Sequence, residues 1–311
     1  MAASIDEAEF IWKNGELIPW ANATVHVLST AVQFGSSVFE GIRCYDTKQG
    51  PAVFRLPEHI TRLRNSWRIY RMDPRYSEQD LVQASLDVVR ANKLSSAYIR
   101  PMVMRGYGSM TMDGAGSPIE TVIPAWKWGA YLGKDALAKG VDVCVSSWAR
   151  AASNTFPGMA KAAGHYNNAA LIKMEAQRLG YVEAIALTPN GIVSEGSGQN
   201  VFAVMDDQIV TPPIEGSNLQ GITRASVFQI ANDLGIPVKE MMMPREALYG
   251  AQELFFAGTA TEITPIRSVD DIEIGAGKMG PVTAQIQERF LGIVSGEIED
   301  QHGWLTPVRP S

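Results

Sequence analysis

Residues 183–211 read EAIALTPNGIVSEGSGQNVFAVMDDQIVT, and this stretch gives the clearest indication of the fold class. Strand-like runs at 183–187, 200–205 and 208–211 are separated by turn signals such as Pro189-Asn190-Gly191. Strands joined by short turns pair antiparallel, whereas a regular alternation of strands and helices would indicate a parallel sheet. The stretch therefore predicts a mixed α+β fold.

Helical patterns lie on both sides of these strands. Apolar side chains that recur every three to four residues predict helices over 57–72, 81–93, 167–179, 223–234 and about 281–291. Ser77 and Asp80 are spaced as a variant of the capping box ahead of the second helix. Asn167 or Asn168 is expected to cap the third helix, and Gly180 to end it.

The first part of the chain adds further strands. Asn14-Gly15 between apolar runs predicts a β-hairpin over 10–20. Strands are also expected at 97–103, 121–125 and 141–147. The segment 106–118 is rich in Gly, Ser, Met and Asp without a clear period, which is typical of a long functional loop. We place the domain junction near 131–139.

Length and composition narrow the class of protein. The chain has 311 residues, more than one domain usually contains, so one large or two moderate domains are expected. Hydrophobic residues make up 46% and charged residues 19%, as in ordinary globular proteins. The formal net charge of −6 argues against a general nucleic-acid binder, because backbone phosphates require a basic surface.

Other features point to the cytoplasm as the expected location. Residues 1–7 lack the basic and apolar regions of a signal peptide, and no uncharged apolar run approaches the length of a membrane span. Cys44 and Cys144 lack metal-ligand spacing, so neither a metal nor a disulfide framework is expected. Two cysteines in a chain of this length are typical of a reducing compartment.

Lys161 is the lysine whose surroundings suit covalent chemistry. A lysine that attacks a carbonyl group must be partly neutral, which requires desolvation and few nearby carboxylates. Lys161 stands in Pro157-Gly158-Met159-Ala160-Lys161-Ala162-Ala163-Gly164, and no acid occurs between Asp142 and Glu175. Taken alone, this context also fits a surface lysine at the edge of a loop.

Two further residues suit a pyridine cofactor. Tyr166, five positions after Lys161, could donate a hydrogen bond to a phenolate oxygen, although it could equally anchor the start of a helix. Glu195 stands at a strand end before a Gly-Ser-Gly turn and could pair with a protonated pyridine nitrogen, although taken alone it also fits an exposed acid in a turn. This turn is not a dinucleotide fingerprint, because it lacks the third glycine and leads into a strand.

Phosphate binding has its own candidates. Gly221-Ile222-Thr223 leads directly into a helix, so its free N–H groups and the positive end of the helix dipole would face an anion. The Gly258-Thr259-Ala260-Thr261 turn offers amides and hydroxyls, and Arg62 offers a full positive charge. Each of these also has an ordinary explanation as a helix cap, a tight turn or a solvated arginine.

The ordered motifs resemble those of the branched-chain aminotransferases, which are fold-type IV enzymes that use pyridoxal 5'-phosphate (PLP). The resemblance runs from about Phe10 to Trp304. It rests on Ser37-Val38-Phe39-Glu40-Gly41-Ile42-Arg43-Cys44-Tyr45, Ala97-Tyr98-Ile99-Arg100-Pro101, Trp128-Gly129-Ala130-Tyr131-Leu132, Ala160-Lys161-Ala162, Ser194-Glu195-Gly196, Gly221-Ile222-Thr223-Arg224 and Gly258-Thr259-Ala260. Seven motifs in order over nearly the whole chain make a specific signal.

The resemblance implies a role for each candidate residue. Lys161 corresponds to the Schiff-base lysine and proton shuttle, Glu195 to the partner of the pyridine nitrogen, and Tyr166 to the partner of the phenolate oxygen. The phosphate site is implied at Arg62, Gly221, Ile222, Thr223 and Thr259. The substrate pocket is implied at Phe39, Tyr98, Arg100, Trp128, Tyr131, Thr259 and Ala260. Arg100 and Tyr98 match residues that accommodate the glutamate side chain or orient the substrate.

The resemblance also implies a two-domain α+β architecture, the one shared with D-amino acid aminotransferases, with PLP in the cleft between domains. The expected division is a small domain at 1–132, a connection at 133–140, and a large domain at 141–311 that carries Lys161. The expected partners are amino acids and 2-oxo acids, and a second copy of the chain in a homodimer or a hexamer of three dimers. The segment 109–113 is expected to cover the neighbouring subunit's site.

Relatives of the same fold remain as alternatives. D-amino acid aminotransferases, aminodeoxychorismate lyases and (R)-selective amine transaminases would share Lys161 and Glu195, so these two residues do not discriminate. The stretches Phe39-Glu40-Gly41-Ile42-Arg43 and Tyr98-Ile99-Arg100 favour the branched-chain group. The altered segment 109–113, and Phe34 where a tyrosine is frequent, leave the substrate range open. A non-catalytic phosphate-binding relative and a nicotinamide oxidoreductase are disfavoured.

Overall fold

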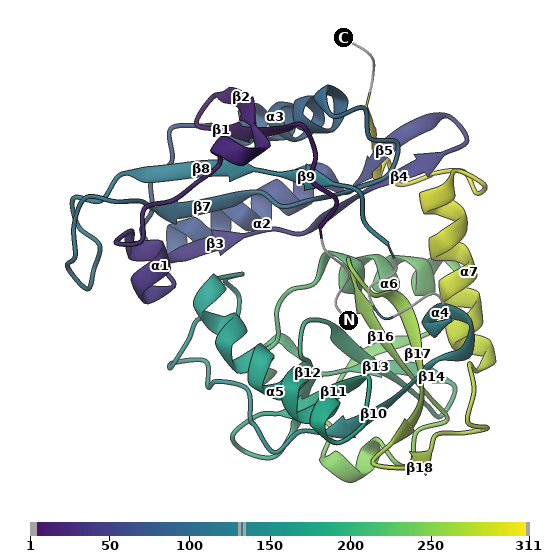
Figure 1. The fold of residues 1–311 in the computed structure, drawn as a ribbon. Helices are drawn as coiled ribbons and strands as arrows, with labels where there is room; N and C mark the ends of the chain where they lie inside the picture. The colour runs from purple at the N-terminus through teal and green to yellow at the C-terminus, as the bar shows by residue number, and fades with distance from the viewer. Residues whose placement is uncertain (1–4, 130–131, 133–134, 309–311) are drawn as a thin grey trace. The chain divides into compact units, whose positions relative to one another are not determined.

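The computed structural model describes residues 5–129, 132 and 135–308, which form helices and mixed sheets (Figure 1). The predicted α+β class is confirmed. The chain separates into two compact units. Among the described residues, the first unit contains 5–129, 160–164 and 293–308, and the second contains 132, 135–159 and 165–292.

Two five-stranded antiparallel sheets build the first unit. The first has the order β2 (Glu16–Pro19), β1 (Phe10–Lys13), β8 (Ile119–Ile123), β7 (Met102–Arg105) and β3 (Ser37–Phe39). The second has the order β19 (Leu305–Pro307), β5 (Gly50–Phe54), β4 (Ile42–Thr47), β6 (Ala97–Ile99) and β9 (Ala125–Trp126). The predicted hairpin at Asn14-Gly15 is confirmed, and both residues have the positive φ that such a turn requires.

Two long helices, α2 (Leu56–Ile69) and α3 (Glu78–Ala91), supply much of the core of this unit. Leu63 of α2 and Val88 of α3 are fully buried in one cluster with residues from both sheets, such as Ile42 and Val103. The predicted capping box is confirmed, because Asp80 N–H donates to Ser77 Oγ and Ser77 N–H donates to the Asp80 carboxylate. The short helix α1 (Thr30–Phe34) precedes β3.

Two of the predicted strands were wrong in extent, because prolines divide them. The stretch 97–103 forms β6 in one sheet and β7 in the other, with the break at Arg100-Pro101. The stretch 121–125 contains the end of β8 and the start of β9, with the break at Pro124. Proline lacks the N–H that a continuous ladder needs. Arg100 N–H donates to Pro124 O at 2.9 Å, so a backbone hydrogen bond joins the two points at which the chain passes from one sheet to the other.

A nine-stranded sheet forms the second unit. Its order is β12 (Val193–Gly196), β11 (Glu183–Leu187), β10 (Val141–Val145), β17 (Glu262–Val269), β16 (Glu253–Gly258), β13 (Asn200–Met205), β14 (Gln208–Thr211) and β15 (Val238–Glu240), with β18 (Ile272–Glu273) paired to β17. Strand β10 is parallel to β11 and β17, and β14 to β15, whereas the other pairs are antiparallel. The stretch 183–211 thus supplies four strands of this sheet.

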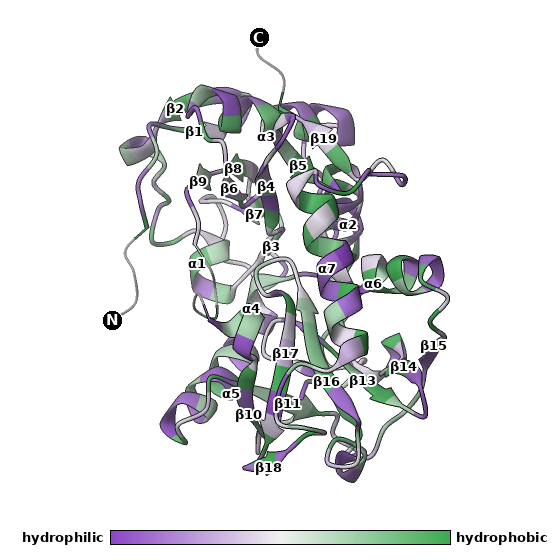
Figure 2. Cartoon of the chain, turned by 90° about the vertical axis from the view of Figure 1, so that its right-hand side faces the viewer, coloured by the Kyte–Doolittle hydropathy of each residue, from purple (hydrophilic) through white to green (hydrophobic). Residues whose placement is uncertain are grey.

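Helices α4 (Ala136–Lys139), α5 (Tyr166–Arg178), α6 (Ile222–Asp233) and α7 (Pro281–Ser295) complete the fold, with single 3-10 turns at Trp20–Asn22, Ala163–His165, Ile214–Gly216 and Arg245–Ala247. Figure 2 shows hydrophilic and hydrophobic residues mixed along α3 and α7, as expected of amphipathic helices. The predicted cap of α5 was wrong. The residue before α5 is His165, and Asn168 donates to Ala149 O instead.

The segment that contains Lys161 packs with the first unit, whereas the sequence-based division placed it in the second domain. Ala162 forms an isolated antiparallel bridge with Val38 and is buried in the core of the first unit. The contacts of this short segment therefore differ from those of its sequence neighbours. Among the described residues, no helix has the length and apolar character required to cross a membrane.

Candidate active site

Lys161 is held in place by two hydrogen bonds of its backbone. Its N–H donates to Ser66 Oγ at 2.9 Å, and its carbonyl oxygen accepts from Phe39 N–H at 3.0 Å. Its Nζ lies 5.1 Å from the centre of the Phe39 ring, a distance at which an ammonium group is attracted to an aromatic face. The half-buried Lys161 therefore has a defined position against an aromatic ring.

A buried ion pair lies within electrostatic range of this lysine. Arg62 donates to both oxygens of Glu40, from Nε at 2.6 Å and from Nη2 at 2.8 Å. His59 Nδ1 lies 2.7 Å from the same carboxylate. Because a carboxylate only accepts, His59 Nδ1 carries the proton of this hydrogen bond. Arg62, which we expected at the phosphate, is thus bonded to Glu40 in the structure.

The electrostatics of this cluster favour a charged Glu40 and a neutral His59. Burial by itself would raise the pKa of Glu40, but the positive charge of Arg62 and the hydrogen bonds hold that pKa well below its usual range. Burial lowers the pKa of His59, against the opposing effect of Glu40, and the charges of Arg62 and Lys161 lower it further. The cluster is therefore charged only on the carboxylate and the guanidinium near neutral pH.

The four predicted substrate residues that the structure describes in the first unit lie together. The Arg100 guanidinium carbon lies 4.6 Å from the Phe39 ring centre and 5.2 Å from that of Tyr98. Arg100 Nη2 donates to Tyr98 Oη at 3.3 Å. The Tyr98 ring stacks on Trp128 at 4.8 Å, and Trp126 contacts both rings. The result is an aromatic surface with one arginine, suited to apolar and carboxylate-bearing side chains.

Gly41 makes room for this surface. A Cβ on Gly41 would lie 1.9 Å from Tyr98 Oη, which is far closer than any real contact. Any other residue at position 41 would therefore displace the Tyr98 ring. This requirement gives a physical reason for the glycine in the Phe39-Glu40-Gly41 motif.

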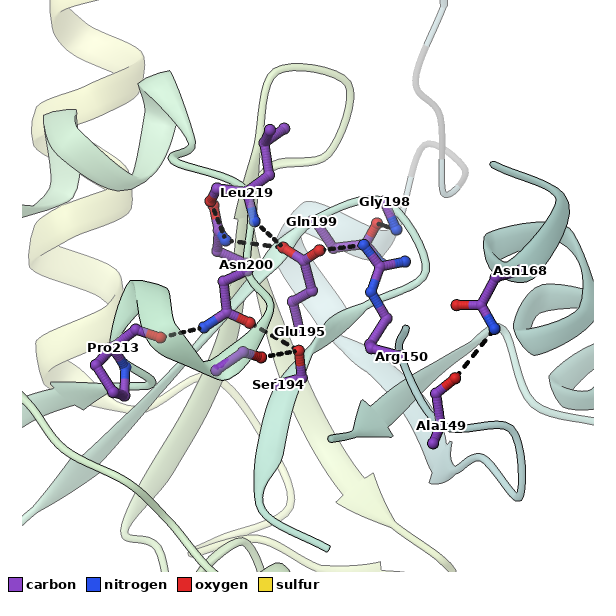
Figure 3. Close-up of polar contacts among 12 residues, drawn as sticks. Ala149, Arg150, Asn168, Ser194, Glu195, Gly198, Gln199, Asn200, Pro213 and Leu219 are labelled. Carbon is purple, nitrogen blue, oxygen red and sulfur yellow. Dashed lines mark hydrogen bonds and ion pairs between the residues drawn. The ribbon is translucent and has the colours of Figure 1, made fainter. Parts of the chain in front are cut away.

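Glu195 forms the centre of a second network, which belongs to the second unit (Figure 3). Its side chain is almost fully buried at the end of β12. Arg150 Nη2 donates to Oε1, while Asn200 Nδ2 at 3.1 Å and Leu219 N–H at 3.2 Å donate to Oε2. The carboxylate therefore lies among hydrogen-bond donors and beside a cation.

The N-terminus of α6 lies next to this network. Gly221 is the residue before α6. Because glycine has no side chain, it does not cap the N–H groups of the first turn of this helix. A Cβ on Gly221 would lie 2.1 Å from Asn200 Oδ1, so glycine is required there. Ile222 and Thr223 form the first turn, and Thr223 is buried. Backbone N–H groups at a helix start are suited to binding a phosphate.

The predicted residues Thr259 and Ala260 lie in the turn between β16 and β17, where Gly258 pairs with Glu262. Within the described residues, Thr261 Oγ1 in this turn is buried without a hydrogen-bond partner. A Cβ on Gly258 would lie 2.9 Å from that oxygen and 3.1 Å from Gln199 Cβ. The turn therefore lies against the residue before Asn200 and offers a polar group to a ligand.

Two predicted residues, Tyr166 and Tyr131, remain. Tyr166 is the half-buried first residue of α5 in the second unit. Tyr131 lies outside the described residues. Sequence reasoning missed the roles of four residues: Glu40, Arg150 and Asn200, which bond to predicted residues, and His59, which bonds to Glu40. Glu40 stands inside the Phe39-Glu40-Gly41 motif, Asn200 follows the Gly-Ser-Gly turn after Glu195, and Arg150 is a cation in the acid-poor stretch before Lys161, so a signal was available for three of them.

Comparison with known protein families identifies the family of this chain. The family described as Amino-transferase class IV matches residues 37–269. The chain belongs to the class IV aminotransferases. The matched range contains every predicted site residue, from Phe39 to Ala260.

Relatives of this class IV aminotransferase match it over nearly its full length. The branched-chain-amino-acid aminotransferase of Salmonella typhimurium is 52% identical over 303 residues, which cover 97% of this chain and 98% of that protein. The crystal structure of the branched-chain amino acid aminotransferase from Escherichia coli has a TM-score of 0.96 at 51% identity, covering 97% and 100% of the two chains. The T.th. branched-chain amino acid aminotransferase complexed with N-(5'-phosphopyridoxyl)-L-glutamate has a TM-score of 0.94 at 44% identity, covering 98% and 100%.

Proposed function

We propose that this class IV aminotransferase transfers amino groups between the branched-chain L-amino acids leucine, isoleucine and valine and 2-oxoglutarate, with PLP as its cofactor. The observation that carries the proposal is the 52% identity, over 97% of the chain, to a protein named branched-chain-amino-acid aminotransferase. The T.th. structure, with a phosphopyridoxyl group joined to L-glutamate, supports both the cofactor and the second substrate.

The residues of the chain fit PLP. The α6 N-terminus, with Gly221, Ile222 and Thr223, provides N–H groups for the phosphate, and the orphaned Thr261 hydroxyl beside Thr259 indicates a polar ligand at the neighbouring turn. Glu195, which accepts hydrogen bonds from Arg150, Asn200 and Leu219, provides a carboxyl group for the pyridine nitrogen, and Tyr166 a phenol for the ring oxygen. Arg62, which bonds to Glu40, is proposed to add positive charge to the phosphate site.

The chemistry then divides among the residues of the chain. PLP, when bound, supplies an electron sink that stabilises negative charge at the substrate α-carbon. Lys161 Nζ would bind the cofactor covalently and, once released by the substrate amine, carry the proton to and from the α-carbon. Glu195 would keep the ring nitrogen protonated, because a cationic ring accepts electrons more readily than a neutral one.

The aromatic surface accounts for the two kinds of substrate. Phe39, Tyr98 and Trp128 would contact a branched aliphatic side chain, whose burial is favourable. Arg100 would pair with the side-chain carboxylate of glutamate. When leucine is bound, the Tyr98 hydroxyl and the two ring faces still contact the guanidinium, which reduces the cost of burying it. Tyr131 and Ala260 are proposed to complete the pocket.

Self-association is part of the proposal. Tyr107, Met110 and Met112 are 56%, 50% and 83% exposed, which is unusual for large apolar side chains within one loop. We expect the segment 109–113 to contact a second copy of the chain in a homodimer or a hexamer. A monomer in light scattering at assay concentration would contradict this. The two buried free thiols, Cys44 and Cys144, support a cytoplasmic location.

A lysine comparison tests the central assignment. Lys161→Ala should abolish transamination between L-leucine and 2-oxoglutarate, and borohydride reduction should no longer add the mass of the cofactor to the protein. Lys139→Ala is the matched control, because Lys139 lies on the surface and pairs with Asp135. Full turnover by the Lys161→Ala variant would refute the assignment of the lysine.

A further inference from the structure

Asn200 stands between the two groups proposed to bind opposite ends of the cofactor. Its Nδ2 donates to Glu195 Oε2 and to Leu219 O, both at 3.1 Å (Figure 3). A side-chain amide has two N–H donors, so these two bonds use the whole donor capacity of Asn200. The side chain is 5% exposed, so water does not readily replace either bond.

The other side of the amide contacts the phosphate-binding turn. Asn200 Oδ1 occupies the space that a Cβ on Gly221 would fill, at 2.1 Å from its position. Leu219 N–H also donates to Glu195 Oε2 at 3.2 Å, so the chain leading into α6 is bonded to the same carboxylate oxygen. The backbone of Asn200 pairs with that of Ala257 in β16, so the residue that carries this side-chain amide is part of the sheet. One residue thus contacts both the acid and the turn, within a single unit.

We propose that Asn200 is a positioning residue that fixes the distance between the Glu195 carboxylate and the N-terminus of α6. The inference rests on the proposed function, because it needs Glu195 at the pyridine nitrogen and Gly221–Thr223 at the phosphate. The ring of PLP is rigid, so its nitrogen and its phosphate are separated by a nearly constant length. A protein whose two anchor points were held at that length in advance would lose less conformational freedom on binding the cofactor.

The proposal predicts that the two anchors act together through Asn200. Glu195→Gln alters one anchor, with a small effect of its own on PLP affinity, and Thr223→Ala alters the other, so their combined effect on PLP affinity should be non-additive in the wild-type background. Coupled residues commonly differ from additivity by a factor of about three or more, whereas independent sites agree within about twofold. With Asn200→Ala, the same pair of substitutions should come closer to additivity, because only the Leu219 N–H bond to Glu195 then joins the two anchors among the bonds described above.

The experiment measures the dissociation constant of PLP by titrating each apoenzyme and following absorbance. Asn200→Ala alone should weaken PLP binding by about two- to tenfold, the cost of ordering on binding a side chain that was held in place beforehand. Asn218→Ala is the matched control, because Asn218 is a buried asparagine of the same segment whose amide donates to Pro213 O and contacts Ser194. If Asn200→Ala does not fold, Asn200→Asp keeps the shape but lacks both donors, and its affinity should also fall.

The outcomes separate this inference from the proposed function. Tight PLP binding by the wild type, with Asn200→Ala indistinguishable from Asn218→Ala, would overturn the inference alone. Coupling of undiminished size in the Asn200→Ala background would also overturn it. No PLP binding by the wild-type apoenzyme would overturn the proposed function and the inference together. Loss of coupling specific to Asn200→Ala, with the melting temperatures of both alanine variants lowered equally, supports it.

Discussion

Each unit of the protein buries a glutamate against an arginine, and the two pairs are built differently. In the first unit, Arg62 contacts both oxygens of Glu40, which is fully buried and also bonded to His59. In the second unit, Arg150 reaches Glu195 from the segment after β10, and Asn200 and a backbone N–H contact the other oxygen. Glu40 is thus held through both of its oxygens by one arginine of α2. Glu195 is held by groups from three segments of the second unit, among the residues proposed to bind the cofactor.

This difference indicates that a buried glutamate–arginine pair can either stabilise the fold or take part in the chemistry. Glu40 has the features of a structural acid, because its partners are buried and its charge is matched within the cluster. Glu195 stands among residues proposed to bind the cofactor. Substitutions at the two glutamates should therefore separate stability from activity.

The largest expected effect is on stability, at Glu40. Glu40→Gln removes the carboxylate charge opposite the buried Arg62, and breaking a buried pair in this way costs about 3–5 kcal/mol. Urea denaturation should show a free energy of unfolding lower by that amount. Glu58→Gln provides the control, because its pair with Arg55 is partly exposed and should contribute less than about 1 kcal/mol. Equal effects of the two substitutions would remove the distinction between the pairs.

The next effect is on catalysis, at Glu195. Glu195→Gln should keep most PLP binding but slow removal of the substrate α-proton by about a hundredfold, as is typical when one electrostatic group of an active site is lost. Stopped-flow measurement with α-deuterated and ordinary L-leucine isolates that step. The same substitution at the exposed Glu246 should change nothing. An unchanged rate of proton removal in Glu195→Gln would contradict the role given to this acid.

A smaller effect is expected on substrate choice, at Arg100. Arg100→Gln should lower kcat/KM for L-glutamate about tenfold more than for L-leucine, because a charge-assisted bond to the glutamate carboxylate is lost. Steady-state kinetics with the two donors measures the ratio. The exposed neighbour of Trp128, Lys127, provides the control as Lys127→Gln. A uniform loss for both substrates would assign Arg100 a structural role.

The smallest effect concerns pH and again involves the first pair. Because burial lowers the pKa of His59, below about pH 6.5 the unfolded chain binds a proton that the folded chain does not. The free energy of unfolding should therefore fall as the pH falls, by at most about 1.4 kcal/mol per pH unit from this group. His165, whose pKa burial lowers to about 4, contributes with the same sign.

Comparison of the wild type with His59→Gln isolates the contribution of His59, because His165 is present in both proteins. Denaturation curves at pH 8, 7, 6 and 5.5 should give a steeper loss of stability for the wild type below about pH 6.5. Below about pH 4.3 the wild type should lose further stability, because the unfolded chain then protonates Glu40 while the folded chain does not. Identical slopes for the two proteins between pH 7 and 5.5 would contradict the buried, neutral state of His59.

Local signals in the sequence predicted much of the fold. The Asn14-Gly15 hairpin and the capping box at Ser77 and Asp80 depend on neighbouring residues, and both are present. The strand at 97–103 was predicted as continuous, because the period of its side chains does not reveal that Pro101 moves the chain to another sheet. The helix α5 ends just before Gly180, as predicted, but the predicted N-cap was wrong: Asn168 lies inside the helix and donates to Ala149 O, a tertiary partner that local sequence does not show.

The candidate site was predictable to a similar extent. Local context together with the family resemblance singles out Lys161 and Glu195 in the sequence, whereas Arg150 and Asn200 are connected to the site by bonds to Glu195 and Leu219 that span 45 and 19 positions. The sequence suggested a free charge at Arg62, but a carboxylate that is distant in the chain, Glu40, binds it. Pairings of this kind depend on the fold, so they become visible only in three dimensions.

The visible spectrum of the PLP-loaded protein tests the central claim most directly. Samples would be mixed separately with L-leucine, L-glutamate, D-alanine and an (R)-aryl amine, and the absorbance band of the lysine-bound cofactor followed over time. The account predicts that L-leucine and L-glutamate bleach this band quickly while the other two lag. Faster bleaching by D-alanine or the amine would contradict the assignment to branched-chain L-amino acids, although the cofactor assignment would stand.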